Sequence, residues 1–287
     1  VSCDGNAITC IDRTWNTNAI YNRVWSFPGG NPSTSTDSIP VVTYAAPGTY
    51  DVTLTVTNAS GSNVLTRTGM VNIFSASGNS TAPLVEGFET VTWPNGNWYL
   101  ENNGVNNWQI ISGTSYSGNK CAKLNNYSGN PSGSKSVFVT EGYDLANLTN
   151  LTMNFKLSFA TRNGSADDLR IYYSLDCGKS WFVRYNKSGA NLSTAGDLLN
   201  NFTPNNNSQW RQENVSIAAL NGKNNVRFKF EFNSQGGNNI YIDDINITIL
   251  TGVGENALEQ QISMFPTPTT GDVFVDLSAI KNNTVQI

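Results

Sequence analysis

Strict two-residue alternation of apolar and polar side chains is the feature that most limits how this chain can fold. Met153, Phe155, Leu157 and Phe159 alternate with polar residues. The same alternation recurs at Tyr50/Val52/Leu54/Val56, Leu169/Ile171/Tyr173 and Val226/Phe228/Phe230/Phe232. Because successive side chains of a strand point to opposite faces, the pattern predicts strands with one buried face. No stretch combines a helical period with capping residues, so the sequence predicts an all-β protein.

Turn signals and polar stretches divide the chain into segments. Pro-Gly and Gly-Gly pairs punctuate the expected strands at short intervals, which is typical of sandwiches. Stretches of small polar residues at 75–81 and 251–256 are candidate linkers. The 287 residues correspond to about two domains at roughly 150 residues each. We therefore expect a first sandwich at 1–75, a larger one at 82–250 and a short β tail at 257–287.

Composition excludes several classes of function. The chain has 17 Lys and Arg against 21 Asp and Glu, so it offers no basic surface and nucleic acid is not an expected partner. It contains no His, which removes the commonest general base and the usual activation of a Ser or Cys nucleophile. No run of 18 apolar residues predicts a membrane span. Because the chain begins at Val1 without a signal peptide, we expect a processed or excised piece of a secreted protein.

The four cysteines indicate an oxidising compartment. Cys3, Cys10, Cys121 and Cys177 form an even set in a chain rich in Asn, Ser, Thr and Gly. Of the three possible connectivities, Cys3 with Cys10 and Cys121 with Cys177 keeps each bridge inside one expected domain. Four buried free thiols are the alternative, and a four-thiolate zinc site is disfavoured because no Cys-x2-Cys pair is present.

The first segment carries an ordered set of aromatic and turn residues. Trp25 and Phe27 precede Pro28-Gly29-Gly30, and Tyr44 precedes a Pro-Gly-Thr-Tyr-Asp-Val-Thr-Leu-Thr-Val-Thr-Asn run at 47–58. This order resembles polycystic-kidney-disease-type (PKD) domains, which are small immunoglobulin-like sandwiches, although Pro-Gly-Gly replaces the usual Gly-Asp-Gly. The Trp-x-Phe-Pro-Gly-Gly-x-Pro form resembles the PKD domains that follow the catalytic domain in secreted bacterial zinc metallopeptidases of the cytophagalysin/pappalysin kind. The resemblance implies that Trp25 is a core residue and that Pro47-Gly48 is a turn.

A three-residue motif lies in the same segment. Asp37-Ser38-Ile39 resembles the Asp-Ser/Thr-aliphatic signal for bacterial O-glycosylation of exported proteins. Ser38 is therefore a candidate glycosylation site.

The second segment opens and closes with recognisable runs. It begins Leu-Val-Glu-Gly-Phe-Glu at 84–89, contains Leu-Arg-Ile-Tyr-Tyr-Ser-Leu-Asp-Cys-Gly-Lys-Ser-Trp at 169–181, and closes Asn-Ile-Tyr-Ile-Asp-Asp-Ile-Asn-Ile at 239–247. With the Trp residues between 93 and 108, this set resembles the MAM-like, cleaved-adhesin type of jelly roll found in gingipain adhesins. The family's function as an adhesin makes a host or surface protein, or a glycan, a candidate partner.

The closing run contains a phase slip. Ile240 and Ile242 share one parity, whereas Ile245 and the isoleucines after it share the other, which predicts a β-bulge at Asp243-Asp244. In the resembling family, acidic residues of the first and last strands bind calcium. The resemblance therefore implies a structural Ca²⁺ held by Glu86 or Glu89 with Asp243 or Asp244, completed by carbonyls and water. The alternative is that these acids face solvent or accept hydrogen bonds at strand ends.

Aromatic residues raise the question of sugar binding. The seven Trp, Trp181 among them, could stack on sugar rings on a concave face together with Tyr116 and Tyr127. The favoured interpretation is that Trp98, Trp108 and Trp181 fill the core. Paired carboxylates occur, but no recognisable motif fixes a pair for glycoside hydrolysis.

The tail resembles a secretion signal. Met-Phe-Pro-Thr-Pro-Thr-Thr-Gly-Asp at 264–272 matches the opening of the type A C-terminal sorting domain of type IX secretion cargo, with Thr267 where Asn is usual. The residues that carry the match are Pro266, Pro268, Thr270 and Gly271. Only part of such a domain is present, and an edge hairpin on the preceding domain is the alternative.

Taken together, these features predict a non-catalytic C-terminal region of a secreted or cell-surface protein, most simply a metallopeptidase. The resemblance implies that the type IX secretion machinery exports it across the outer membrane, with the β modules serving as spacer and recognition elements. A glycan-binding or adhesin module is the alternative function.

Overall fold

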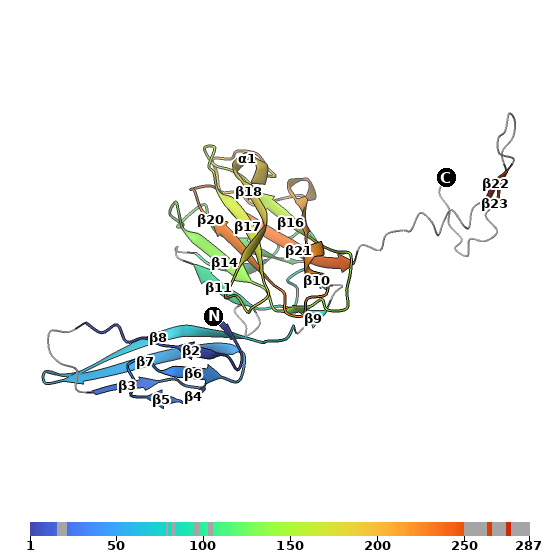
Figure 1. Cartoon of the computed structure of the whole chain (residues 1–287). Coiled ribbons are helices and arrows are strands. Elements are labelled where there is room, and N and C mark those ends of the chain that lie inside the picture. Colours follow the sequence, from blue (N-terminus) through green and yellow to red (C-terminus); the bar gives the residue numbers. More distant parts are fainter. Residues whose placement is uncertain are drawn as a thin grey trace. The chain divides into compact units, whose positions relative to one another are not determined.

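The computed structural model describes residues 1–15, 22–78, 80–81, 84–93, 98–102, 106–249, 263–265 and 274–276. Residue contacts divide the chain into two compact units, 1–249 and 250–287 (Figure 1). The first unit contains an immunoglobulin-like sandwich followed by a jelly-roll sandwich, which confirms the all-β class predicted from alternation and the two sandwich types implied by the resemblances. Within the described ranges, no helix is long and apolar enough to cross a membrane.

The first sandwich is built from two sheets. The larger sheet has the order β1 (Ser2–Cys3), β8 (Gly61–Phe74), β7 (Gly48–Asn58), β3 (Asn22–Ser26) and β5 (Thr34–Ser35). The smaller sheet has the order β2 (Ala7–Thr9), β6 (Val41–Tyr44) and β4 (Gly30–Asn31). Trp25 and Phe27 lie in the core between them, which confirms the role expected for Trp25. Tyr50 enters β7 directly after the Pro47-Gly48 turn, and its ring packs 4.3 Å from that of Tyr44.

The jelly roll also has two sheets, and their ladders are antiparallel. One has the order β12 (Trp108–Ser112), β13 (Lys120–Leu124), β21 (Ile240–Ile249), β16 (Leu151–Phe159) and β19 (Arg211–Ser216), with β10 (Leu84–Glu86) also pairing with β21. The other, called here the groove sheet, has the order β11 (Tyr99–Asn102), β14 (Lys135–Val139), β20 (Arg227–Asn233), β17 (Asp168–Ser174) and β18 (Phe182–Ser188).

Aromatic rings fill the jelly-roll core. Phe138 of β14 stacks on Phe230 of β20 with ring centroids 4.5 Å apart, and Phe155 of β16 meets Phe230 edge-on from the opposite sheet. Trp98 and Trp108 are buried in this core, as one reading of the sequence expected. Trp181 is only partly buried and lies outside it.

Short elements complete the described chain. They are β9 (Ser80–Thr81), which pairs in parallel with β15 (Tyr143–Asp144), and the short helices α1 (Gly189–Leu192), η1 (Asn207–Gln209) and η2 (Ala218–Leu220). In the second unit, β22 (Ser263–Phe265) pairs antiparallel with β23 (Phe274–Asp276). The predicted sorting residues Pro266, Pro268, Thr270 and Gly271 lie outside the described residues.

The β-bulge predicted from the phase slip is confirmed. Asn246 of β21 faces Asn154 of β16, but Asp243 faces Lys156, so β21 takes one residue more than its partner between the two pairs. Asp244 has a φ of 46°, which lies in the left-handed region and marks the extra residue.

The disulfide pairing differs from both predicted bridges. Cys3 is bonded to Cys177, 174 residues apart in sequence, whereas Cys10 and Cys121 are buried free thiols. The expectation that each bridge stays within one sandwich is wrong because β1 pairs in parallel with the end of β8. That pairing places Cys3 level with Phe74, beside the jelly-roll turn that carries Cys177. Cys10 and Cys121 instead pack in separate apolar clusters.

Candidate functional site

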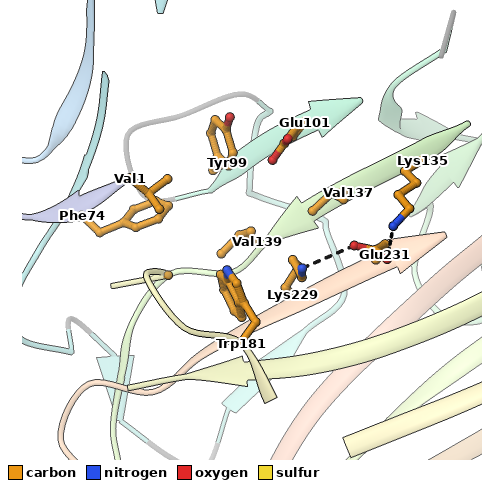
Figure 2. Close-up of a pocket in the computed structure, with 11 residues that line it drawn as sticks. Val1, Phe74, Tyr99, Glu101, Lys135, Val137, Val139, Trp181, Lys229 and Glu231 are labelled. Carbon is orange, nitrogen blue, oxygen red and sulfur yellow. Dashed lines mark hydrogen bonds and ion pairs between the residues drawn. The ribbon is translucent and has the colours of Figure 1, made fainter. Parts of the chain in front are cut away.

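A cavity of about 420 Å³ opens on the outer face of the groove sheet (Figure 2). Strand alternation explains which side chains line it. On β14, Phe138 points into the core, so Val137 and Val139 lie on the opposite face. On β20, the phenylalanines are buried in the core, which leaves Lys229 and Glu231 to face outward. We refer to this cavity as the groove.

One end of the groove is apolar and aromatic. Figure 2 shows Phe74, Tyr99 and Trp181 gathered around Val139 at this end. Phe74 and Tyr99 meet edge-on with ring centroids 6.2 Å apart. Val139 is only 3% exposed although it points away from the jelly-roll core, because Phe74 and the neighbouring Cys3–Cys177 bridge cover it. The first sandwich therefore supplies part of the wall.

The other end of the groove is charged. The Glu231 carboxylate lies 3.4 Å from the Lys135 ammonium and 3.3 Å from that of Lys229, and the Tyr172 hydroxyl donates to it at 3.3 Å. Burial alone would raise the pKa of Glu231, but the two lysines outweigh burial and lower the pKa. Glu231 is therefore a fixed anion at neutral pH. Glu101 adds an exposed carboxylate at this end.

Lysine and aromatic rings connect the two ends. The Lys229 ammonium lies 4.2 Å from the ring centroid of Tyr172 and 5.2 Å from that of Trp181. Both contacts have cation–π geometry, and together they hold the ammonium between the two rings. The groove thus presents an apolar ring wall beside a paired cation and anion, which is an arrangement suited to binding rather than to proton transfer.

The predicted calcium ligands lie around a different feature, the loop 115–120. Two strands pair with the same edge of β21: β13 at residues 240–242 and β10 at residues 245–247. The bulge at Asp243 lies in the gap between them, where it faces this loop. The Asp243 carboxylate is fully buried and accepts the backbone N–H groups of Tyr116 at 2.8 Å and Ser117 at 3.2 Å. Burial raises the pKa of Asp243 to about 6 despite these hydrogen bonds.

Of the other acids, two contact the same loop and Glu86 contacts a residue just after its strand. Asp244 accepts the Ser117 hydroxyl at 2.7 Å, and Glu89 accepts the N–H groups of Asn119 and Lys120 at 2.8 Å each. Glu86 instead accepts the N–H of Phe88 at 2.6 Å. The structure thus brings Glu89, Asp243 and Asp244 to one loop. In the part of the chain that the structure describes, no group of three or more Asp, Glu, Cys or His side chains is placed to hold a metal. The calcium site stays a prediction.

The remaining candidate residues are dispersed. Ser38 is exposed, and its glycosylation stays a prediction. Of the residues suggested for sugar stacking, Trp181 is the one found among those that line the groove. Tyr116 and Tyr127 lie outside the groove lining, and a cation lies over each ring, Lys156 at 4.2 Å and Arg162 at 4.7 Å from the centroid.

Sequence reasoning missed the charged residues of the groove. The signal was present in the Phe-Lys-Phe-Glu-Phe run at 228–232, where the polar residues must face away from the buried phenylalanines. The contribution of Phe74 carried no such signal, because it depends on how the first sandwich meets the jelly roll.

Comparison with protein families identifies the first segment. Residues 4–73 match the PKD domain family. Among curated proteins, no sequence matches this chain.

Three solved structures illustrate the structural comparison. A carbohydrate-binding-module structure of the β-sandwich superfamily, studied for promiscuous specificity, is 17% identical over 86% of this chain and 93% of its own, with a TM-score of 0.41. The K3 cleaved adhesin domain of Lys-gingipain from Porphyromonas gingivalis W83 is 18% identical over 57% of this chain and 98% of its own, with a TM-score of 0.42. The CBM22-1 xylan-binding domain of Paenibacillus barcinonensis Xyn10C is 9% identical over 61% of this chain and 96% of its own, with a TM-score of 0.35.

Proposed function

We propose that this chain is a non-catalytic recognition and spacer region of a secreted or cell-surface protein. The observation that carries the proposal is the groove, where the buried carboxylate of Glu231 is held ionised between two lysines. A carboxylate fixed in this way binds well but is poorly suited to exchange protons near neutral pH. The absence of His from the sequence is consistent with this role.

The finer proposal concerns the parent protein and its export. The PKD match at residues 4–73 supports an extracellular multidomain parent, and the Trp-x-Phe-Pro-Gly-Gly-x-Pro form favours a zinc metallopeptidase. The Phe-Pro-Thr-Pro-Thr-Thr-Gly run at 265–271 favours export through the type IX secretion machinery. In the organism that encodes the chain, loss of the type IX outer-membrane channel should leave the protein in the periplasm. Unchanged export in such a strain would refute this route.

A binding panel tests the recognition role. The full chain should bind at least one member of a set of purified polysaccharides and purified surface proteins, measured by surface plasmon resonance. Chromatography of the same polysaccharides after incubation should show no shortened products. Release of shortened products would contradict the non-catalytic assignment.

A glycan-binding module is the second candidate function, and one observation favours it. The groove places the partly buried ring of Trp181 beside hydrogen-bonding charges over an apolar floor. Sites that combine apolar walls with a few fixed polar groups are typical for small ligands, including sugars.

A further inference from the structure

We propose that the groove binds a neutral saccharide, with a sugar ring against Trp181 and its hydroxyls on the Lys229–Glu231 pair. The proposal rests on the recognition role above and names the ligand class of the same site. At about 420 Å³ the cavity lies within the range of roughly 300–1,000 Å³ found for small-ligand sites, which leaves room for a short oligosaccharide.

The aromatic end supplies a surface for the apolar face of a sugar. Trp181 lines the groove and is only partly buried, so part of its ring remains accessible beside the Lys229 ammonium, 5.2 Å from the ring centroid. The indole packs closely against Gly178, since a Cβ at that position would stand 3.0 Å from the indole atom Cζ2. Tyr99 and Phe74 continue the aromatic wall (Figure 2). A ring already held in place loses little conformational freedom when a ligand packs on it.

The charged end is suited to hydroxyl groups. A sugar hydroxyl both donates and accepts hydrogen bonds, and neighbouring hydroxyls can therefore meet a lysine donor and a carboxylate acceptor together. The Lys229 ammonium and the Glu231 carboxylate lie 3.3 Å apart and offer a donor and an acceptor at one place. Hydrogen bonds to charged partners are stronger than those between neutral groups.

The charge balance favours a neutral ligand. Two lysines, Lys135 and Lys229, and two glutamates, Glu101 and Glu231, line this end, so their formal charges cancel. A carboxylated sugar would meet the Glu101 and Glu231 carboxylates as well as the lysines. Neutral hydroxyls avoid this repulsion and can use both signs of charge.

The groove is composite, which separates it from a site on the jelly-roll sheet alone. Phe74 ends β8 of the first sandwich, and the Cys3–Cys177 bridge holds the adjacent β1 at the jelly-roll turn that precedes Trp181. We therefore expect saccharide affinity to need the oxidised bridge. Reduction of the bridge should weaken binding because the aromatic wall loses its fixed position.

Calorimetry on the full oxidised chain tests the proposal. The neutral probes are cellohexaose, xylohexaose and β-1,4-galactotriose, and the acidic probe is trigalacturonate. At least one neutral probe should bind more tightly than trigalacturonate. Trp181→Ala and Lys229→Gln should each weaken that binding at least tenfold. Trp15→Ala is the matched control, because Trp15 is 88% exposed and lies outside the groove, and it should leave the affinity unchanged.

The outcomes separate this inference from the recognition role. Tighter binding of trigalacturonate would overturn the neutral-ligand assignment. Saccharide binding that survives both groove substitutions would overturn the site but leave a glycan-binding role standing. Binding to a surface protein without any saccharide binding would overturn the inference and leave recognition intact. If Trp181→Ala does not fold, Trp181→Tyr and probe-induced NMR shifts of the Lys229 and Glu231 amides provide the test.

Discussion

The guanidinium carbon of Arg227 lies 4.3 Å from the ring centroid of Phe74, so a strand of the jelly roll contacts the last residue of β8. Arg227 is only 2% exposed, and its guanidinium donates to the carbonyl oxygens of Thr140 at 3.2 Å and Ser75 at 3.3 Å. Burial lowers the pKa of Arg227 to about 10, which still leaves it charged at neutral pH. The contact joins the first sandwich to the groove sheet.

Replacing Arg227 should destabilise the protein strongly. Arg227→Met keeps much of the apolar stem but leaves the two carbonyl oxygens without their charged donor and removes the cation–π contact. Hydrogen bonds to charged groups contribute about 1.5–3 kcal/mol each, so we expect a loss of about 3 kcal/mol or more. Urea unfolding at neutral pH measures this loss. The control is Arg184→Met, which changes an exposed arginine over the Tyr173 ring and should cost less than about 1 kcal/mol, the upper limit for a surface contact. Equal losses in the two variants would contradict the role given to Arg227.

The corrected disulfide predicts a definite thiol count. Denatured protein without reductant should release two titratable thiols, from Cys10 and Cys121, and peptide mapping should find Cys3 joined to Cys177. In the chain-entropy picture, a bridge across 174 residues restricts the unfolded chain by about 5 kcal/mol. The double variant with Cys3→Ser and Cys177→Ser should therefore melt at a clearly lower temperature. A count of zero thiols would show that two bridges form.

The paired charges of the groove predict a specific dependence on pH. The pKa of Glu231 is lower in the folded chain than its ordinary value of 4.5, because Lys229 and Lys135 favour the ionised form. The resulting stability is fully present above the unfolded pKa and is lost as pH falls through the lower folded pKa. Glu231→Gln should therefore be less stable than the unmutated chain at pH 7. The difference in unfolding free energy between the two should shrink toward pH 3.

Urea unfolding at several pH values measures this gap. Glu101→Gln, which changes an exposed carboxylate of the same groove, is the matched control. It should leave the fall in unfolding free energy at acid pH nearly unaltered. A constant difference in unfolding free energy between Glu231→Gln and the unmutated chain at all pH values would argue against stabilisation by the lysines.

Local sequence patterns predicted the strands well, whereas contacts between strands that are distant in sequence could not be predicted from them. Alternation located strands such as β16, and the phase slip at Asp243 located the bulge, because both depend on which face of one strand is buried. The Cys3–Cys177 bridge depends instead on β1 pairing in parallel with β8, which no local pattern records. The same limit hid the part of Phe74 in the groove. Lys229 and Glu231 could have been found from the alternation on β20 alone.

Calcium binding at the loop 115–120 remains a prediction that thermal unfolding can decide. Asp243 and Asp244 are adjacent carboxylates, one of them fully buried, and a bound cation would offset their repulsion. If the site exists, calcium at about 100 times its dissociation constant should stabilise the fold by about 2.7 kcal/mol, and a chelator should reverse the effect. Asp243→Asn should abolish the response, whereas Asp37→Asn, at an exposed position in the first sandwich, should retain it. Equal melting temperatures in calcium, magnesium and chelator would show that backbone N–H groups alone satisfy these acids, as the hydrogen bonds from Tyr116 and Ser117 already do in part.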